Sequence, residues 1–165
     1  MEVSFRRRQR WRKKVQRLRR ERGWDNVSDK VILFFSTING YHHFRIMPTQ
    51  FSWNHPYMME CIPEPTNRRD PLAVLVKEMG VNITIGRVPK DICNVISLEM
   101  RVTQKLRRTF CLYIGTHHNE GPVPSGGLKL HCVYVLEFSN DTSYRRLGEV
   151  ASFLRRHVPS SYIYL

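Results

Sequence analysis

Hydrophobic residues from Lys30 onward fall into short runs that turn-forming residues separate. Runs rich in Val, Ile, Phe and Met that stop at Asn-Gly, Pro-Glu-Pro or Met-Gly breaks are typical of β-strands. The residues between the last two runs, 117–127, are mainly polar and predict a loop. The pattern therefore predicts six strands, at Lys30–Ile38, Tyr57–Ile62, Leu72–Lys77, Ile83–Val88, Phe110–Gly115 and Leu128–Phe138.

Two segments change from strand-like to helical spacing. One begins near Pro89, which needs no backbone N–H in a first helical turn, and places Ile92, Val95 and Ile96 at helical intervals. The other follows a run of capping residues, 140–143, and we expect it to end at about His157. Six short strands with one inserted and one C-terminal helix predict a mostly β fold, a small antiparallel barrel.

The composition fits one globular domain. The chain has 165 residues, 41% of them hydrophobic and 25% charged, which is enough for one core. The longest apolar run, Val31–Phe35, is far shorter than the roughly 20 residues of a membrane span, and no secretory signal is recognisable. We therefore expect no membrane partner. The four cysteines are a poor disulfide framework, and we interpret them as free thiols in a reducing compartment.

Positive charge is concentrated at the start of the chain. The formal net charge is +13, of which residues 1–24 carry +9 and residues 25–165 carry +4. We interpret residues 1–24 as a basic arm and residues 25–165 as a single domain. Trp11, Val15 and Leu18 would share one face of a helix, but like charges around them favour disorder in isolation. The basic residues of the arm are Arg6, Arg7, Arg8, Arg10, Arg12, Lys13, Lys14, Arg17, Arg19, Arg20 and Arg22.

A basic arm of this kind suits three uses. It can bind phosphates of a nucleic acid, it can serve as a nuclear-import signal, or it can be a solvated tail. The first two favour a nuclear protein. A mitochondrial address fits the Arg-rich composition but not the shortage of Ser, and a cytoplasmic location stays open.

No pattern of catalytic or metal-binding residues stands out. The cysteines and histidines form no CxxC, HxxxH or HExxH pair, which a structural zinc site usually contains, so we expect no metal and no other cofactor. The acidic residues are scattered, and no nucleophile motif or glycine-rich phosphate loop occurs. We therefore expect no enzymatic activity and no catalytic residues. A nuclease or helicase remnant is the enzymatic alternative, although the chain lacks the motifs of either.

Three motifs between Asn39 and Phe138 form a combination that resembles the HIRAN domain. The first is the run Gly-Tyr-His-His-Phe at residues 40–44, and the second is Glu-Pro-Thr-Asn-Arg-Arg-Asp-Pro-Leu-Ala-Val at 64–74. The third is Ile-Gly-Arg-Val-Pro at 85–89, just before a predicted helix. A later run, 127–134, is similar to the final strand of stand-alone HIRAN-like proteins. The resemblance covers roughly 100 residues, and its motifs are specific only in combination.

The resemblance implies an OB-like barrel that grips the 3′ end of single-stranded DNA. The residues that it places at the grip are His42, His43, Asn67, Arg69, Asp70 and Arg87. This chain has Arg69 where the family usually has an aromatic residue and Arg87 where His is common. Because an aromatic ring stacks on a base, worth about 1–3 kcal/mol, whereas arginine favours phosphate, we expect general single-strand affinity more than end selection.

The residue types at these positions also indicate possible roles without reference to the HIRAN family. Asn67 and Asp70 can hydrogen-bond backbone amides and shape a tight turn, so a structural role for them stays open. Tyr41 offers a stacking face, Arg68 extends the basic loop, and Lys90 sits at a predicted helix N-terminus, a good place for phosphate. The sequence thus indicates a non-catalytic nucleic-acid-binding module, with single-stranded DNA favoured and RNA possible. The alternative is a scaffold whose basic residues meet an acidic protein partner.

Overall fold

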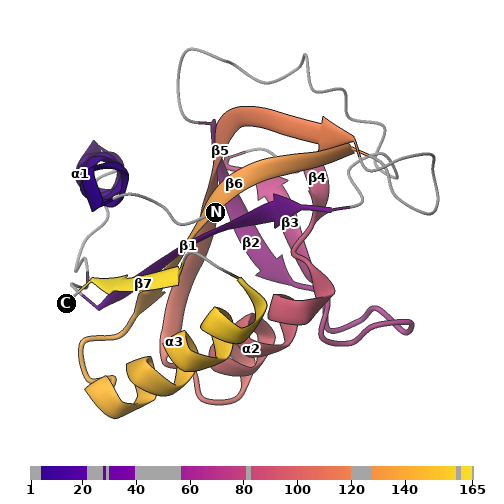
Figure 1. The fold of residues 1–165 in the computed structure, drawn as a ribbon. Helices are drawn as coiled ribbons and strands as arrows, with labels where there is room; N and C mark the ends of the chain where they lie inside the picture. Colours follow the sequence, from indigo (N-terminus) through magenta and orange to yellow (C-terminus); the bar gives the residue numbers. More distant parts are fainter. Residues whose placement is uncertain are drawn as a thin grey trace.

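The computed structural model describes residues 5–21, 28, 30–39, 57–80, 83–119, 128–158 and 161–164. Its elements follow one another in the order shown in Figure 1. They are α1 (Phe5–Glu21), β1 (Val31–Ile38), β2 (Tyr57–Pro63), β3 (Val74–Glu78), β4 (Thr84–Arg87), α2 (Lys90–Arg101), β5 (Leu106–Asn119), β6 (Leu128–Phe138), α3 (Tyr144–His157) and β7 (Ser161–Tyr164).

The strands form one antiparallel sheet in the order β4-β3-β2-β5-β6-β1-β7. The sheet curls until the end of β1 meets the end of β4. There Asn39 and Arg87 exchange two backbone hydrogen bonds of 2.9 and 2.8 Å, which close strands β1 to β6 into a barrel. Strand β7 pairs with the start of β1, from Val31 to Phe34. One edge of β1 therefore has two partners, β7 at its beginning and β4 just beyond its end.

The main core lies inside the barrel and under two helices. Alternate residues of β1, such as Ile32 and Phe34, point into it, as expected for a strand with two different faces. Phe34 stacks on Tyr134 at 5.2 Å between ring centroids, and the Tyr134 hydroxyl donates to the carbonyl of Thr37 at 2.8 Å. Helices α2 and α3 add Ile92, Ile96, Leu147 and Leu154 to the same cluster, and Figure 1 shows the two helices side by side below the sheet.

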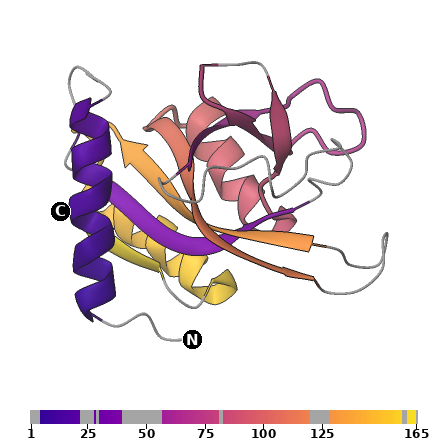
Figure 2. The same ribbon diagram turned by 90° about the horizontal axis from the view of Figure 1, so that it is seen from above.

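A second apolar cluster lies on the outer face of the sheet. It combines residues of β1, β2, β5 and β6, among them Leu33, Phe110 and Val133, with Val15 of α1, whose exposed fraction is only 2%. Figures 1 and 2 show α1 beside the sheet and apart from α2. Helix α1 therefore packs onto the sheet through Val15.

The structure of the basic segment differs from our expectation of disorder. Residues 5–21 form a helix, and the apolar outer face of the sheet supplies the reason. An amphipathic stripe that would be marginal in isolation gains a surface to pack on, and tertiary packing stabilises most protein helices. The division of the chain into residues 1–24 and 25–165 stays a prediction.

The predicted architecture is confirmed, with two corrections. All six expected strands and both expected helices are present within a mostly antiparallel, barrel-like sheet. Strand β5, however, begins at Leu106 and extends through His117, His118 and Asn119, which we had placed in a loop. A seventh strand, β7, follows α3. The predicted capping before α3 is confirmed, since the Ser143 hydroxyl accepts from the backbone N–H of Arg146 at 3.1 Å.

Candidate nucleic-acid interface

The loop between β2 and β3 is held in one shape by its own side chains. The Asn67 Oδ1 accepts from the backbone N–H groups of Arg69 (3.0 Å) and Asp70 (3.2 Å). The Asp70 Oδ1 accepts from the N–H of Leu72 at 3.1 Å. These bonds confirm that Asn67 and Asp70 shape a tight turn by bonding the backbone, as Asn and Asp commonly do. The loop therefore presents Arg68 and Arg69 from a fixed backbone.

Asn67 also reaches the carboxylate of Glu64, which connects the loop to the barrel. Its Nδ2 donates to the Glu64 Oε2 at 3.1 Å, and the Nε and Nη2 of Arg87 lie 3.5 Å from the same oxygen. Arg87 is the last residue of β4 and pairs with Asn39 at the barrel closure. The Arg87 guanidinium is thus oriented by Glu64 at the rim of the barrel and keeps an exposed fraction of 38%. Glu64 is a residue of this site that sequence reasoning missed.

Helix α2 lies against the same loop. The Nη1 of Arg101 donates to the carbonyl of Pro71 at 2.9 Å and so ties the loop to the helix. Burial raises the pKa of the Cys93 thiol, and the negative charge of Asp70 raises it further, which places Asp70 near the first turns of α2. Loop, strand end and helix start therefore form one surface, which we call the rim: residues 64–73, Arg87 and Lys90.

Three cations of the rim are available to a ligand. Arg68, Arg69 and Lys90 are exposed, and none of them forms an ion pair with another residue that the structure describes. Lys90 is the first residue of α2, where backbone N–H groups and the helix dipole also favour an anion. The predicted site residues Asn67, Arg68, Arg69, Asp70, Arg87 and Lys90 are thus brought together. Tyr41, His42 and His43 lie outside the described residues, shortly after Asn39.

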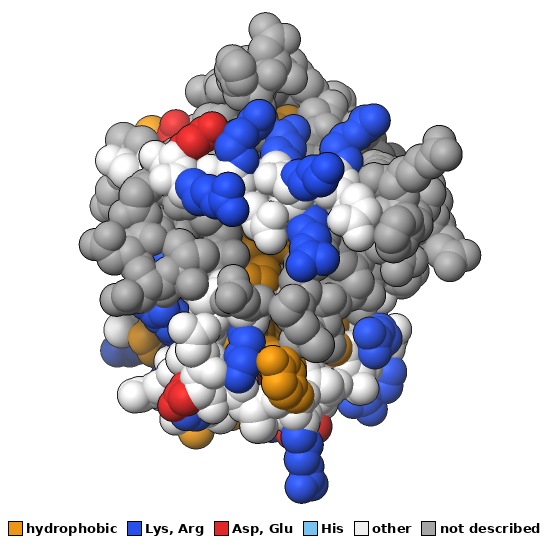
Figure 3. Space-filling view, turned by 90° about the vertical axis from the view of Figure 1, so that its left-hand side faces the viewer, with side chains coloured by type: hydrophobic (Ala, Val, Ile, Leu, Met, Phe, Trp, Pro, Cys, Tyr) orange, Lys and Arg blue, Asp and Glu red, His pale blue; other side chains and the backbone are white. Residues whose placement is uncertain are grey.

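Helix α1 carries a second group of cations. Figure 3 shows Lys and Arg side chains gathered on the face of the molecule where α1 lies. Arg10, Lys13, Arg17 and Arg20 are exposed, whereas Arg12 and Lys14 are half-buried; the side chains of Arg6, Arg7, Arg8 and Arg19, like Arg22 as a whole, are outside the described set. Partial burial lowers the pKa of Lys14, and the positive charges of Arg17 and Arg10 lower it further. The part of this lowering that comes from the two arginines reflects repulsion between cations, which a bound polyanion would relieve.

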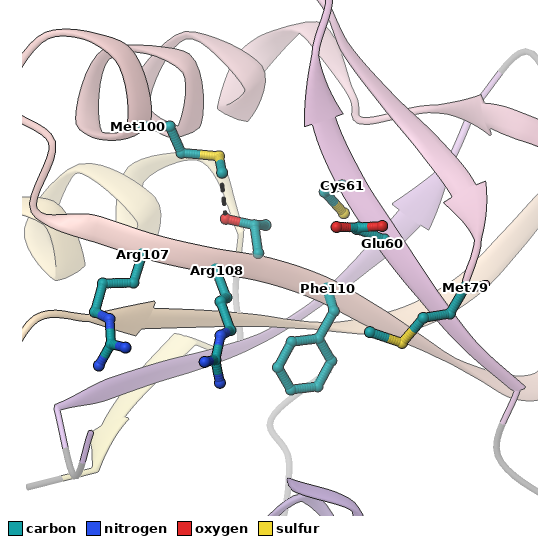
Figure 4. A pocket seen from close by; sticks show the side chains of 8 residues that line it. Glu60, Cys61, Met79, Met100, Arg107, Arg108 and Phe110 are labelled. Atoms are coloured by element: carbon teal, nitrogen blue, oxygen red, sulfur yellow. Dashed lines mark hydrogen bonds between the residues drawn. The ribbon is translucent and has the colours of Figure 1, made fainter. Parts of the chain in front are cut away.

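The arginines at the start of β5 contact a buried acid. Arg107 and Arg108 line a hollow of about 190 Å³ together with Phe110 (Figure 4). Their Nη1 atoms lie 4.0 and 3.7 Å from the Oε1 of Glu137, whose side chain is 0% exposed. Their contacts with Glu137, and that of Arg101 with Pro71, give these side chains structural roles.

The cysteines are core residues. Cys61, Cys93, Cys111 and Cys132 are all free and buried, which confirms their interpretation as free thiols. Burial raises the pKa of the Cys111 thiol well above its ordinary value, and hydrogen bonds with Cys132 and Cys61 act in the same direction. Such thiols stay protonated and are poor nucleophiles. Among the described residues, no group of three or more His, Cys, Asp or Glu side chains is arranged to hold a metal ion.

Within the described part of the chain, no helix combines the length and the hydrophobicity that crossing a bilayer requires.

Comparison with known proteins found proteins of similar structure but none of similar sequence. No family model and no curated protein matches the sequence. Two solved structures match, and both are of the HIRAN domain that the sequence motifs resemble. The crystal structure of the HIRAN domain of human HLTF has a TM-score of 0.47 and 14% identity, and the match covers 81% of this chain and 95% of that chain. For the NMR structure of the HLTF HIRAN domain the TM-score is 0.48 and the identity 15%, with 83% of this chain and 95% of that chain covered.

Proposed function

We propose that this protein is a non-catalytic nucleic-acid-binding module that holds single-stranded DNA at the rim of its barrel. The observation that carries the proposal is the set of three exposed cations, Arg68, Arg69 and Lys90, which have no acidic partner among the described residues. They stand on a rigid turn and a helix start, so little loop order has to be acquired on binding. The sequence resemblance to the HIRAN domain supports the same surface.

Each part of the rim has a distinct role in this proposal. Arg68, Arg69 and Lys90 contact phosphates, and the N-terminus of α2 adds backbone N–H groups. Arg87, oriented by Glu64, can stack on a base or bind the terminal phosphate, because a guanidinium is planar and charged. Asn67 and Asp70 hold the loop. Tyr41, His42 and His43 would supply stacking faces for the terminal bases.

The cations of α1 extend the binding surface in this proposal. Exposed side chains such as Arg10, Lys13 and Arg20 would add phosphate contacts, at a strength that falls with salt concentration. The same basic segment would act as a nuclear-import signal and make the protein nuclear. A fluorescent fusion of the full chain tests this: replacing these three residues by Gln should move the protein out of the nucleus.

The binding proposal is tested by fluorescence anisotropy with a labelled single strand. The first variant, R68Q/R69Q/K90Q, removes the three exposed cations of the rim, and the matched control, R145Q/R155Q/R156Q, removes the same charge from exposed positions of α3. Each phosphate contact with a single strand contributes about 0.7 to the slope of log affinity against log salt. The rim variant should therefore lower that slope by about 2, since three contacts are lost. The control should leave it nearly unchanged.

A second pair of titrations tests which end of the strand is held. Strands with a free and a blocked 3′ hydroxyl are compared at two salt concentrations, and an RNA strand of the same sequence is titrated beside them. Weaker binding of the blocked strand supports end recognition. Equal loss in the rim and α3 variants would show that binding follows net charge alone and would contradict the rim as the site. Absence of binding by the full chain would leave the scaffold alternative.

The α1 cations should be tested by substitution and not by deletion. Val15 is buried against the outer face of the sheet, so removing α1 would expose Leu33, Phe110 and Val133 to water. A lost binding signal could then come from misfolding. The variant R10Q/K13Q/R20Q keeps Val15 in place and changes charge alone.

A further inference from the structure

A groove runs between helices α2 and α3 on the surface of the molecule. The two helices lie side by side (Figure 1), and the Glu99–Arg146 contact joins the end of α2 to the first turns of α3. The helices are therefore antiparallel. The groove has a volume of about 320 Å³, and the residues that matter here are Val95 and Leu98 from α2 with Val150, Phe153 and Arg156 from α3.

The floor of the groove is apolar and partly uncovered. Leu98 is 43% exposed, and Val95 and Phe153 are half-buried at the margin of the core. Helix α2 turns a different face, with Ile92 and Ile96, into the barrel. Leu98 is therefore not needed to attach α2 to the sheet. Its exposure leaves apolar surface in contact with water, which a ligand could bury.

The two ends of the groove differ in charge. At one end Glu99 and Glu149 both contact Arg146, and Arg145 also contacts Glu149 at 3.4 Å, so these charges are already neutralised. At the other end Arg156 lies over the ring of Phe153, with 5.6 Å between its Cζ and the ring centroid. Arg156 is exposed and forms no ion pair with another described residue.

We infer that this groove binds a short acidic segment of a partner protein. A large apolar side chain of that segment would lie between Leu98 and Phe153, and a neighbouring carboxylate would pair with Arg156. Charge complementarity carries the choice of an acidic partner, because Arg156 lines the groove and has no acidic partner among the described residues, whereas Glu99 and Glu149 are already paired. The volume suits one or two anchoring side chains, near the lower limit of ligand pockets.

The chemistry of the groove separates this partner from a nucleic acid. A phosphate backbone needs several cations in a row, whereas the groove offers one available cation beside an apolar floor. A buried apolar anchor with a charged residue at its edge is the arrangement of protein–protein hot spots. The inference does not depend on the proposed binding of DNA at the rim.

The test begins with selection of random dodecapeptides displayed on phage against the immobilised full chain. Enriched peptides should share acidic residues next to Leu, Phe or Met, and the best one is then synthesised with a fluorescent label. Its affinity is measured by anisotropy for the wild type, L98E and R156E. We expect each variant to bind at least about tenfold more weakly, the loss typical of an interface anchor.

Two matched variants control for effects of charge and folding. L72E changes a leucine of similar exposure, 40%, that lies in the rim loop. R155E changes the neighbouring exposed arginine of α3, which does not line the groove. Both should bind the peptide as the wild type does, and all four variants should unfold at nearly the wild-type temperature because the positions are exposed.

Several outcomes would overturn the inference. One is a selection that enriches no acidic peptides, and another is a selected peptide that binds L98E and R156E as tightly as the wild type. A third is a large loss of single-stranded DNA binding in R156E but not in R155E, which would assign the groove to nucleic acid.

Discussion

The ion pair between Glu99 and Arg146 offers a sharp test of how α3 is attached to α2. Glu99 is almost fully buried, with 1% of its side chain exposed, and its carboxylate contacts Arg146 and the Thr103 hydroxyl, the latter at 2.8 Å. Both Glu99 and Glu149 raise the pKa of Arg146. The substitution Arg146→Met removes the guanidinium but keeps an unbranched apolar stem of similar length.

The expected cost follows from the burial of Glu99. Removing one partner of a buried pair typically costs about 3–5 kcal/mol because the other charge is left without compensation. Here the hydrogen bond from Thr103 persists, and Arg146 itself is 35% exposed, so water can approach through its former place. We therefore expect a loss of about 2–3 kcal/mol, below the typical range. For a protein of this size that corresponds to a fall of roughly 4–12 °C in Tm.

Urea and thermal unfolding followed by circular dichroism would measure this loss. Arg145→Met is the matched control, because Arg145 is 90% exposed and, among the described residues, forms its ion pair with the exposed Glu149. An exposed pair of this kind is worth less than about 1 kcal/mol. The double variant E99M/R146M should recover much of the loss, since apolar replacement of a buried pair is often neutral. The reasoning fails if Arg146→Met costs no more than Arg145→Met, or if the double variant is simply additive.

Three further outcomes are expected. Ser143→Ala should lower stability by about 1 kcal/mol in thermal unfolding, because the helix loses the cap that accepts from the Arg146 N–H. Lys105 lowers the pKa of Asp141 below its ordinary 3.8, so this contribution is present at neutral pH and disappears as the pH falls through the lowered value. The Tm gap between wild type and Asp141→Asn should therefore be present at neutral pH and close in acid, below the ordinary pKa of 3.8. The four thiols, Cys111 among them, should resist Ellman's reagent in the native protein and react fully in guanidinium; rapid native labelling would contradict their burial.

Much of the fold follows from local patterns in the sequence. Strand β6 was predicted with the bounds that the structure shows, because its apolar run is long and turn residues flank it. Helix α3 was predicted equally well from a capping residue and a one-sided apolar stripe. In both elements the local preference and the tertiary environment agree, and such elements are the most predictable.

The missed elements depend on partners far away in the chain. Strand β7 has four residues and exists as a strand because the edge of β1 is open beside it. Strand β5 begins at Leu106, before the predicted start at Phe110, because Arg107 and Arg108 interrupt the apolar pattern of the sequence. In the structure both side chains lie near the buried Glu137. Helix α1 needs the apolar outer face of the sheet. None of these surfaces can be recognised before the sheet is assembled.

The candidate site also has some features that local sequence predicts and others that depend on residues far apart in the chain. The backbone bonds of Asn67 and Asp70 are local and could be predicted from residue type. The contact between Glu64 and Arg87 spans 23 positions and requires the closed barrel, so no local pattern in the sequence predicts it. The binding roles of the rim residues stay predictions until the titrations are made.

The two partners that share one edge of β1 have a consequence for solubility. The strand begins Val-Ile-Leu-Phe-Phe, an uncharged run with a strong preference for extended pairing, which would promote aggregation if its edge were open. The bridge to Arg87 covers the far end of that edge, and β7 covers its beginning. Detachment of β7 would therefore expose the edge of Val31–Phe34, an apolar segment with a strong preference for β-pairing, to a second molecule. By occupying this edge, β7 protects β1 from pairing with a strand of another molecule. We expect a bulky fusion placed directly after β7 to weaken that protection.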